Sequence, residues 1–487
     1  MILFSFFTLV ILLSTVKYKK ISKYNNILYF CIFVFIFVTY CVFSAHSCSS
    51  IHFLPKRELN IYFFTGNFYN WLMTSFFNFK LNLDVSADFV NYLSNLSPEY
   101  FLNQSSIPME VKMFYDTSIY NDKIYLYFGI TPIILFYAPF YLITHFFLSD
   151  QIVFAVLSIL IFVLQLLMFK KILLCLIQSD ILKKDITEYF TVTSLIILSL
   201  CNAIPLTYID ISVHSIAVLT SIFCQLVAIY FCLLLQDGCT KIKMFIIGLF
   251  LSLAVGSRPS SVILLILFFI LMVSMFNIKK YYKQYMCFFI PVIIYGTILA
   301  VYNYLRFNSV FDFGFLYQFS PTHEKTLVRD LGHSFPDYIK YVCLNIFSLP
   351  RFSSITPLCL FNRYEPMIGG MIACPIIFFL LFIKSFYSKA FGKNKYICFL
   401  FSIMLITSLM YLLTDSYIGS NARYVAEYLF LILIPSIVSF YFFVENTNNI
   451  KLQKILNFLF LTLVFFSLYV NINLMNCIFL LSKEGII

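Results

Sequence analysis

The sequence predicts an all-α polytopic membrane protein, and its composition and the spacing of its apolar residues support that prediction. The 487 residues are 61% hydrophobic and 11% charged, whereas a soluble globular chain carries about 25% charged residues. With 33 basic and 22 acidic side chains, the chain cannot surround a core of this size with solvated groups. The apolar residues also gather in runs of roughly 20, the length at which a helix crosses a bilayer. A water-soluble fold is therefore excluded, and about 11–13 transmembrane helices are expected.

The predicted spans are apolar runs bounded by charged or turn residues. They cover residues 2–16, 27–43, 127–147, 152–169, 190–206, 212–235, 245–255, 262–276, 286–304, 368–383, 397–413, 429–444 and 455–474. The first run has no basic residue before it and no small-residue cleavage site, so a retained helix is favoured over a signal peptide.

Two polar stretches are too long to be tight turns, and we expect them to be functional loops outside the cytoplasm. They divide the chain into five parts: N-terminal transmembrane helices (1–45), a first extracytoplasmic loop (46–126), a central transmembrane bundle (127–304), a second extracytoplasmic loop (305–367) and C-terminal transmembrane helices (368–487).

The number of runs between the two loops conflicts with this layout. Seven apolar runs separate the loops, and an odd number of spans would place them on opposite sides of the membrane. One run is therefore expected to be re-entrant or broken, or a short helix at 172–182 inserts. The weakest spans are 245–255, which has eleven residues, and the segment interrupted by Pro205. Non-helical backbone at this depth requires surrounding protein or a water-filled cavity.

The net charge of +11 follows membrane topology rather than a nucleic-acid surface, so no nucleic acid is expected as a partner. Nineteen Lys lie in clusters between apolar runs, which the positive-inside rule assigns to the cytoplasm. All seven Arg then fall on the outer side. They are Arg57, Arg258, Arg306, Arg329, Arg351, Arg363 and Arg423. Because guanidinium forms a planar fork that fits phosphate or carboxylate, an outward anion site is indicated; pairing with external carboxylates is the alternative.

Three of these arginines have informative surroundings. Arg258 interrupts apolar sequence on both sides in GLFLSLAVGSRPSSVILLILFF, and an intramembrane Arg is a functional candidate because it costs a few kcal/mol to bury unpaired. A short surface loop is the alternative. Arg306 directly follows a span and lies near Asp312, so a surface ion pair would also explain it. Arg423 and Glu427 are four residues apart and could pair on one helical face.

The first loop carries carboxylates that could act as a general base toward an acceptor hydroxyl or amine. They are Asp84, Asp88, Glu99, Glu110, Asp116 and Asp122, with tyrosines around the last two. For each one, a helix cap or a solvated loop position is the alternative. The six His show no zinc-binding spacing, no nucleotide-binding GxxxxGK[ST] loop is present, and the 14 Cys form no CxxC pair. No metal site and no cofactor are predicted, although the acidic loop leaves a divalent cation open.

Several strings resemble the type C glycosyltransferase (GT-C) superfamily, whose members take a sugar from a polyprenyl-phosphate carrier. These strings are FYNWLMTSFFNFKLNLDVS, DTSIYNDKIYLYFGITPIILFYAPFYL, GLFLSLAVGSRPSS, YNYLRFNSVFDFGFLYQ and NARYVAEYLFLILIP. The chain looks closest to bacterial members related to protein O-mannosyltransferases and lipid A aminoarabinose transferases. The resemblance implies a GT-C-like fold in the bacterial cytoplasmic membrane, an outward site, and inverting transfer onto a lipid, glycan or protein acceptor.

By residue, the resemblance implies a general base, for which Asp116 is the first candidate and Asp84 the second. Arg258 is the first candidate for the lipid phosphate and Arg423 the second. Tyr125, Tyr127 and Arg306 complete the predicted substrate-binding set. Many relatives have an acidic residue where this chain reads TGNFYNWL, with Gly66 and Asn67. Asp84 or Asp116 would then replace it, or the chain would bind lipid-linked sugar without transferring it.

Two other functions stay open. A transporter or flippase for a lipid-linked saccharide would share the outer anion site but predicts alternating access, and no internal repeat of the kind common in transporters is visible. An assembly subunit without a site predicts that Arg258 has no cavity beside it.

Overall fold

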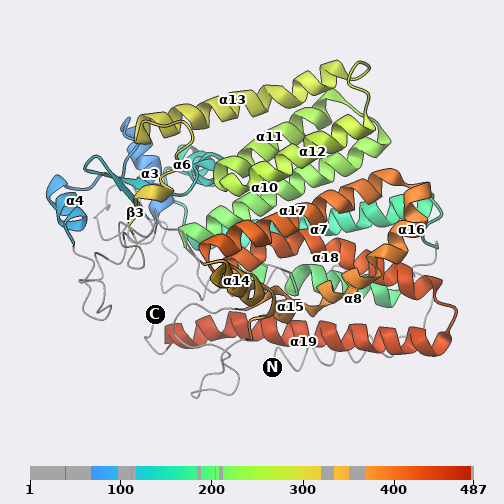
Figure 1. Cartoon of the computed structure of the whole chain (residues 1–487). Coiled ribbons are helices and arrows are strands. Elements are labelled where there is room, and N and C mark those ends of the chain that lie inside the picture. Colours follow the sequence, from blue (N-terminus) through green and yellow to red (C-terminus); the bar gives the residue numbers. More distant parts are fainter. Residues whose placement is uncertain are drawn as a thin grey trace.

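The chain forms an elongated helical bundle in a computed structural model (Figure 1). The structure describes residues 67–96, 117–183, 188–202, 204–207, 212–319, 334–349 and 368–483, together with Thr39, Val111 and Phe114. The predicted runs 2–16 and 27–43 lie outside the described residues, apart from Thr39.

Seven helices in the described part of the chain are long and apolar enough to cross a membrane, which confirms a multi-pass, predominantly α-helical membrane protein. They are α7 (Asp150–Gln178), α10 (Val213–Leu234) with its extension η6 (Leu235–Asp237), α13 (Tyr282–Phe307), η9 (Pro375–Phe382) continued by α16 (Ile383–Lys393), α17 (Lys395–Ile418), α18 (Ala422–Asn446) and α19 (Ile450–Lys483).

Shorter helices complete the bundle. They are α8 (Glu188–Leu200), α9 (Ile204–Thr207), α11 (Lys241–Ser257), η7 (Pro259–Ser261) and α12 (Val262–Met275). The predicted run 245–255 lies within α11, a continuous 17-residue helix that extends beyond the run at both ends. Helix α11 packs between α10 and α13. Helix α18 is the central element: its residues from Ala422 to Phe442 are buried on all sides except Arg423. A helix that is apolar all round is expected in such a position.

One end of the bundle, on the right in Figure 1, collects the described lysine clusters, and we call it the lysine end. Side chains here tie distant helix ends together. Lys171 Nζ lies 2.8 Å from Asp237 Oδ2, and Lys393 Nζ donates to the Asp180 carbonyl at 2.8 Å. Lys389 Nζ donates to Asn446 Oδ1 at 2.7 Å. These bonds place the α7, α10, α16 and α18 termini together.

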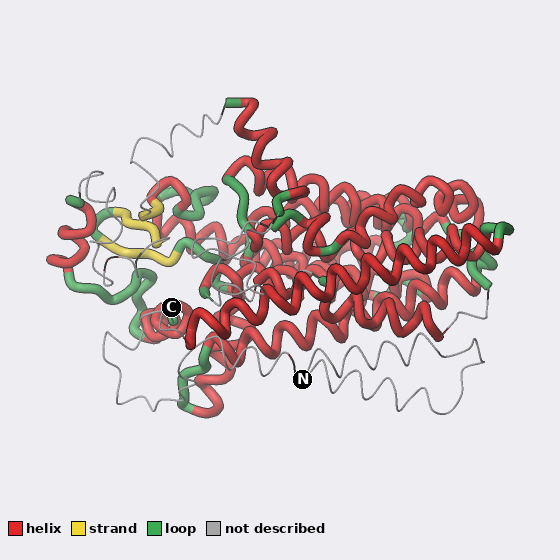
Figure 2. The backbone as a smooth tube through the Cα atoms, turned by 90° about the horizontal axis from the view of Figure 1, so that it is seen from below, coloured by secondary structure: helices red, strands yellow, loops and turns green. Residues whose placement is uncertain are grey.

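The opposite end carries a small three-stranded antiparallel sheet and is here called the sheet end (Figure 2). Its strands, in the order β2-β1-β3, are β1 (Thr117–Tyr120), β2 (Lys123–Leu126) and β3 (Gln318–Phe319). Asn121 and Asp122 both have positive φ, at 48° and 54°, as a two-residue hairpin turn of the primed type requires. The sheet was not expected from the sequence, and it joins the predicted loops 46–126 and 305–367.

The remaining elements lie around the sheet end or link the bundle to it. They are α3 (Phe68–Phe77), α4 (Ala87–Ser94), η8 (Phe315–Tyr317), α14 (Phe335–Phe347) and α15 (Gly370–Ala373). Helix α14 is fastened to the end of α17, because Asn345 Nδ2 donates to Ser416 Oγ at 2.8 Å and to the Gly419 carbonyl at 3.1 Å.

The predicted span 127–147 is wrong, because this segment starts and finishes at the sheet end. It forms the π-helical turn η5 (Ile133–Tyr137) and α6 (Ala138–Thr144), which ends at left-handed His145. The Leu126 carbonyl before it accepts from Arg306 at the end of α13, and the Leu148 carbonyl after it accepts from Asn70 of α3. Removing this run from the seven leaves an even number of passes, so the two predicted loops share one end.

Candidate functional site

A pocket opens at the sheet end between three parts of the chain that are distant in sequence. The empty space between its walls is about 410 Å³, including open solvent at its mouth. Its walls are the segment that follows β2, the junction of α11 with η7, the last two turns of α13, and Phe313. The lining residues are Tyr127, Phe128, Gly129, Ile130, Val255, Gly256, Ser257, Arg258, Pro259, Leu299, Tyr302, Asn303, Arg306 and Phe313.

Two glycines let the re-entrant segment lie directly on α11. A Cβ atom on Gly129 would lie 1.8 Å from the Gly256 carbonyl oxygen, so only glycine permits this backbone approach. Thr131 Oγ1 donates to the Leu253 carbonyl at 2.7 Å, and Tyr295 shares a hydrogen bond with Thr131 at 2.8 Å. This contact fixes the wall of the pocket that carries Tyr127.

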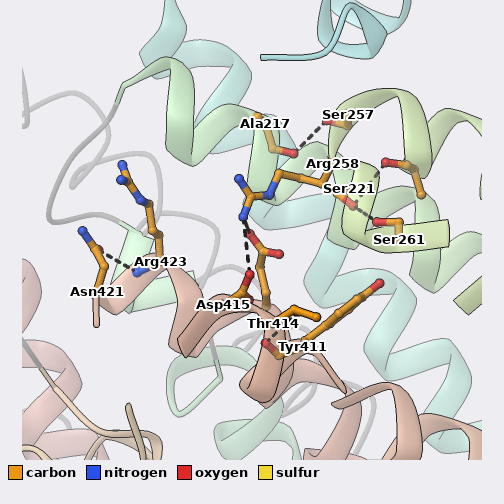
Figure 3. A network of polar contacts seen from close by, with 12 residues as sticks. Ala217, Ser221, Ser257, Arg258, Ser261, Tyr411, Thr414, Asp415, Asn421 and Arg423 are labelled. Carbon is orange, nitrogen blue, oxygen red and sulfur yellow. Dashed lines mark hydrogen bonds and ion pairs between the residues drawn. The ribbon is translucent and has the colours of Figure 1, made fainter. Parts of the chain in front are cut away.

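Arg258 lies where α11 ends in front of Pro259, and two acidic side chains from neighbouring helices hold it (Figure 3). Its Nη2 lies 2.5 Å from Glu427 Oε1 on α18 and 3.9 Å from Asp415 Oδ1 on α17. The Arg258 side chain is 13% exposed, and the two carboxylates are 3–5% exposed. A buried charge requires such partners, yet Arg258 Nε is buried without a hydrogen-bond partner among the described residues.

A layer of hydrogen-bonded polar side chains lies behind Arg258. Ser257 Oγ donates to the Ala217 carbonyl at 2.8 Å, and Ser221 and Ser261 share a hydrogen bond of 2.8 Å. Gln225 Nε2 donates to Ser221 and Ser261, and its carbonyl oxygen accepts from the Tyr411 hydroxyl at 3.1 Å. Because each of these groups has a partner, the layer can persist inside an apolar bundle.

Arg306 forms the second basic wall of the pocket and is 4% exposed. Its Nη1 donates to the Leu126 carbonyl at 2.9 Å and its Nη2 to Asn303 Oδ1 at 2.8 Å. The guanidinium carbon lies 3.8 Å from the ring centroid of Tyr302, a cation–π distance. Within the described part of the chain, Arg306 Nε and the Tyr302 hydroxyl have no hydrogen-bond partner. Arg306 therefore anchors β2 and also lines the pocket.

Of the two predicted tyrosines, Tyr127 lines the pocket and Tyr125 does not. Burial raises the pKa of the Tyr127 hydroxyl to about 12, and the positive charge of Arg258 opposes that shift. The hydroxyl is therefore a proton donor at neutral pH. Tyr125 belongs to an aromatic cluster on the sheet, with its ring centroid 5.3 Å from that of Phe307.

Arg423 begins α18, where its backbone N–H is capped by Asn421 Oδ1 at 3.1 Å. Its guanidinium points away from Asp415 in Figure 3, and the residue does not line the pocket. Its charge still acts on Tyr127 and Glu427. The ion pair of Glu427 described above is with Arg258, on a different helix, rather than the predicted one along α18.

None of the predicted acidic residues that the structure describes lines the pocket. Asp84 is exposed on the segment between α3 and α4 and pairs with Lys80 at 2.8 Å. Asp116 lies outside the described residues; the next residue, Thr117, pairs with Leu126 in the sheet. No acidic side chain of the described ranges lines the pocket, and within these ranges no group of three or more His, Cys, Asp or Glu could hold a metal ion.

The sequence reasoning did not select Tyr302, Asn303, Asp415 or the pairing of Glu427 with Arg258. Tyr302 and Asn303 precede Arg306 by four and three residues, so all three lie on one face of α13. That spacing of polar residues at the end of an apolar run was the available signal.

Comparison with models of known protein families finds no match to this chain, and comparison with curated proteins finds none either.

Proposed function

We propose that this chain is a membrane glycosyltransferase that moves a sugar from a polyprenyl-phosphate donor to an extracytoplasmic acceptor. The observation that carries the proposal is that Arg258 and Arg306 line one pocket at the end of the bundle remote from the lysine clusters.

Orientation follows from charge. The described lysine clusters gather at one end, and cytoplasmic ends of membrane proteins carry the excess of Lys and Arg. The sheet end, with its pocket, then faces outward from the bacterial cytoplasmic membrane. A donor whose lipid tail stays in the outer leaflet would present its phosphate at this depth.

The pocket suits a phosphate that stays attached to its lipid. Among the described residues, no hydrogen-bond partner meets the buried Nε–H of Arg258 or of Arg306, and the hydroxyls of Tyr127 and Tyr302 add neutral donors. Guanidinium binds phosphate oxygens through charge-assisted hydrogen bonds. Glu427 and Asp415 hold Arg258 in place, so the site is ordered before the substrate arrives.

In the proposed reaction, the acceptor oxygen attacks the anomeric carbon of the sugar and the bond from that carbon to the phosphate oxygen breaks. The bonding electrons go to the phosphate, which leaves with its lipid. Donors aimed at the departing phosphate oxygens stabilise the charge that develops there. Asp116, the first candidate from the sequence for the general base, lies outside the described residues. Asp84 is less suited to that role because Lys80 pairs with it and it does not line the pocket.

The test measures transfer by the full chain in lipid nanodiscs. Radiolabelled mannose or glucose linked to a polyprenyl phosphate is the donor, and a membrane extract of the source cells supplies acceptors. Arg258→Lys and Arg306→Lys keep the charge but lose the planar fork, and each is expected to lower kcat/KM about tenfold or more. Lys279→Gln, an exposed change at the lysine end, is the control. Thermal unfolding of each variant separates lost chemistry from lost folding. Wild-type transfer rates in both folded arginine variants would contradict the proposal.

A further inference from the structure

The loop that follows α13 carries a carboxylate beside the pocket. Asp312 directly precedes Phe313, which lines the pocket, and it follows Arg306 by six residues. The side chain is half-buried and lies close enough to Arg306 for their charges to attract. The sequence predicted a surface ion pair between Arg306 and Asp312. Arg306 is instead 4% exposed and forms part of the pocket wall.

The backbone holds Asp312 in a defined position. Its Oδ1 accepts from the Gly314 N–H at 2.7 Å. Gly314 has φ +92°, and a Cβ there would lie 2.6 Å from Ser118 Oγ and from the Phe307 ring, so glycine is required. Ser118 in turn donates to the Gly314 carbonyl at 2.8 Å. The loop is thereby fastened to β1.

Tyr317 lies near the carboxylate. Burial together with the Asp312 charge raises the pKa of this tyrosine. The Tyr317 ring stacks on Phe307 with centroids 5.6 Å apart and an interplanar angle of 21°. Asp312 is therefore held by the Gly314 N–H, beside an ordered tyrosine, while it stays half-exposed.

The buried acids near the pocket are already engaged. Asp415 and Glu427 flank Arg258 and are 3–5% exposed. Asp150 is buried and accepts from the Tyr137 hydroxyl at 2.5 Å. A general base must come within hydrogen-bond reach of the acceptor proton, and these groups are too deeply buried to meet an acceptor that enters from outside.

The exposed acids at the sheet end are separate from the pocket. Asp84 pairs with Lys80, and Asp337 accepts from Ser334, which caps α14. Asp88 and Asp122 are exposed, and no residue adjacent to them in sequence lines the pocket. Among the described acidic residues, Asp312 alone is both half-exposed and next to a lining residue.

We propose that Asp312 is the general base that takes the proton from the acceptor hydroxyl. This inference rests on the proposed glycosyltransferase function. As the new bond forms between the acceptor oxygen and the anomeric carbon, the hydroxyl proton passes to the Asp312 carboxylate and later to water. The bond between the anomeric carbon and the phosphate oxygen breaks, and the electron pair leaves with the polyprenyl phosphate. Arg306 lies near the Asp312 carboxylate that takes the proton, and it also lines the pocket in which the phosphate would bind.

The test separates donor binding from turnover. Asp312→Asn preserves the Oδ1 acceptor for Gly314 and removes the proton acceptor. Its kcat is expected to fall about 100-fold or more, the usual contribution of a general base, with KM for the lipid-linked donor within about twofold of wild type. Asp312→Glu is expected to recover part of kcat. Asp122→Asn, an exposed change at the same end, is the matched control and should be neutral.

Three outcomes have distinct meanings. A fall in kcat for Asp312→Asn, with normal unfolding temperature and donor KM, supports the inference. Wild-type kcat in Asp312→Asn overturns it, and if Asp116→Asn is inactive the base is Asp116. An absence of transfer by the wild-type chain from every polyprenyl-phosphate sugar overturns the proposed function itself. Should Asp312→Asn unfold, Tyr317→Phe, which removes the hydroxyl near the carboxylate, is expected to lower kcat with little change in KM; an unchanged kcat there counts against the inference.

Discussion

The guanidinium of Arg258, at the end of α11, lies 2.5 Å from the carboxylate of Glu427, near the start of α18. The pair joins the helix that forms the pocket wall to the central helix of the bundle. Since both side chains are largely buried, the ion pair is shielded from water, and removing either charge deprives the other of its nearest counter-ion.

Removing Glu427 should therefore destabilise the fold strongly. We expect Glu427→Ala to lower the free energy of unfolding by about 3 kcal/mol, the lower end of the range for breaking a buried pair, because Asp415 still offers a carboxylate 3.9 Å from Arg258. Denaturant unfolding in detergent measures the change. Glu445→Ala, on the same helix at the lysine end, is the control; its half-buried carboxylate accepts one backbone N–H, and about 1 kcal/mol is expected. Equal losses would contradict the special role of the Arg258 pair.

Tyr302→Phe should separate ligand binding from stability. Its hydroxyl is buried without a partner in the described part of the chain, so its removal should leave the unfolding temperature unchanged or raise it. If the hydroxyl contacts the substrate phosphate, KM for the donor rises about fivefold, equivalent to roughly 1 kcal/mol. Tyr295→Phe is the matched change, because that hydroxyl bonds Thr131 and its loss should cost about 1 kcal/mol of stability. A lower unfolding temperature for Tyr302→Phe would argue for a structural hydroxyl instead.

Gly129→Ala should disrupt the wall that carries Tyr127. The new Cβ would meet the Gly256 carbonyl oxygen at 1.8 Å, and backbone cannot rotate away as a side chain can. Overpacking of this kind costs about 3 kcal/mol or more, which thermal unfolding would detect. Gly296→Ala on α13 places its Cβ in open space and is expected to be neutral or stabilising. Two similar melting curves would show that the close backbone approach is absent in solution.

The two ends of the bundle should be accessible from opposite sides of the membrane. In a cysteine-free background, Lys123→Cys at the sheet end and Lys279→Cys at the lysine end replace exposed residues of the same type. With the lysine end in the cytoplasm, a membrane-impermeant thiol reagent should label the first variant in intact cells. It should label the second only after permeabilisation. The reverse labelling pattern would place the pocket on the cytoplasmic side and would contradict a reaction outside the cytoplasm.

Apolar run length predicted most of the described helices but not their ends. The runs 212–235, 286–304 and 397–413 correspond to α10, α13 and α17, and α11 begins at Lys241 although its apolar run was placed from 245. Lysines extend such helices because their stems pack on apolar surface while the charges reach water. The run 127–147 was wrongly predicted to span the membrane, because a re-entrant segment is as apolar as a spanning helix. Its π-helical turn and the left-handed backbone of His145 lie between contacts with α13 and α3. Such contacts cannot be predicted from the hydropathy of the segment.

The candidate site was predictable in part for the same reason. Arg258 could be selected because a charge within apolar sequence needs a local explanation. Its partners could not, since Asp415 and Glu427 follow it by more than 150 residues and only helix packing brings them together. Helical spacing pointed instead to a pair between Arg423 and Glu427. The sequence favoured Asp84 over Asp312 as a candidate base, because the half-burial of Asp312 beside the pocket depends on the sheet that fastens its loop.

The cross-links at the lysine end bear on how a substrate could enter and leave. Lys393 bonds the carbonyl of Asp180, Lys389 bonds Asn446, and Asn394 bonds Ser179 at 3.0 Å, so helices from both halves of the chain are clamped where they turn. A carrier that exposes its cargo first to one compartment and then to the other would have to undo this clamp in every cycle. In the proposed reaction, the lipid-linked sugar would therefore enter and the spent lipid would leave the protein at the sheet end.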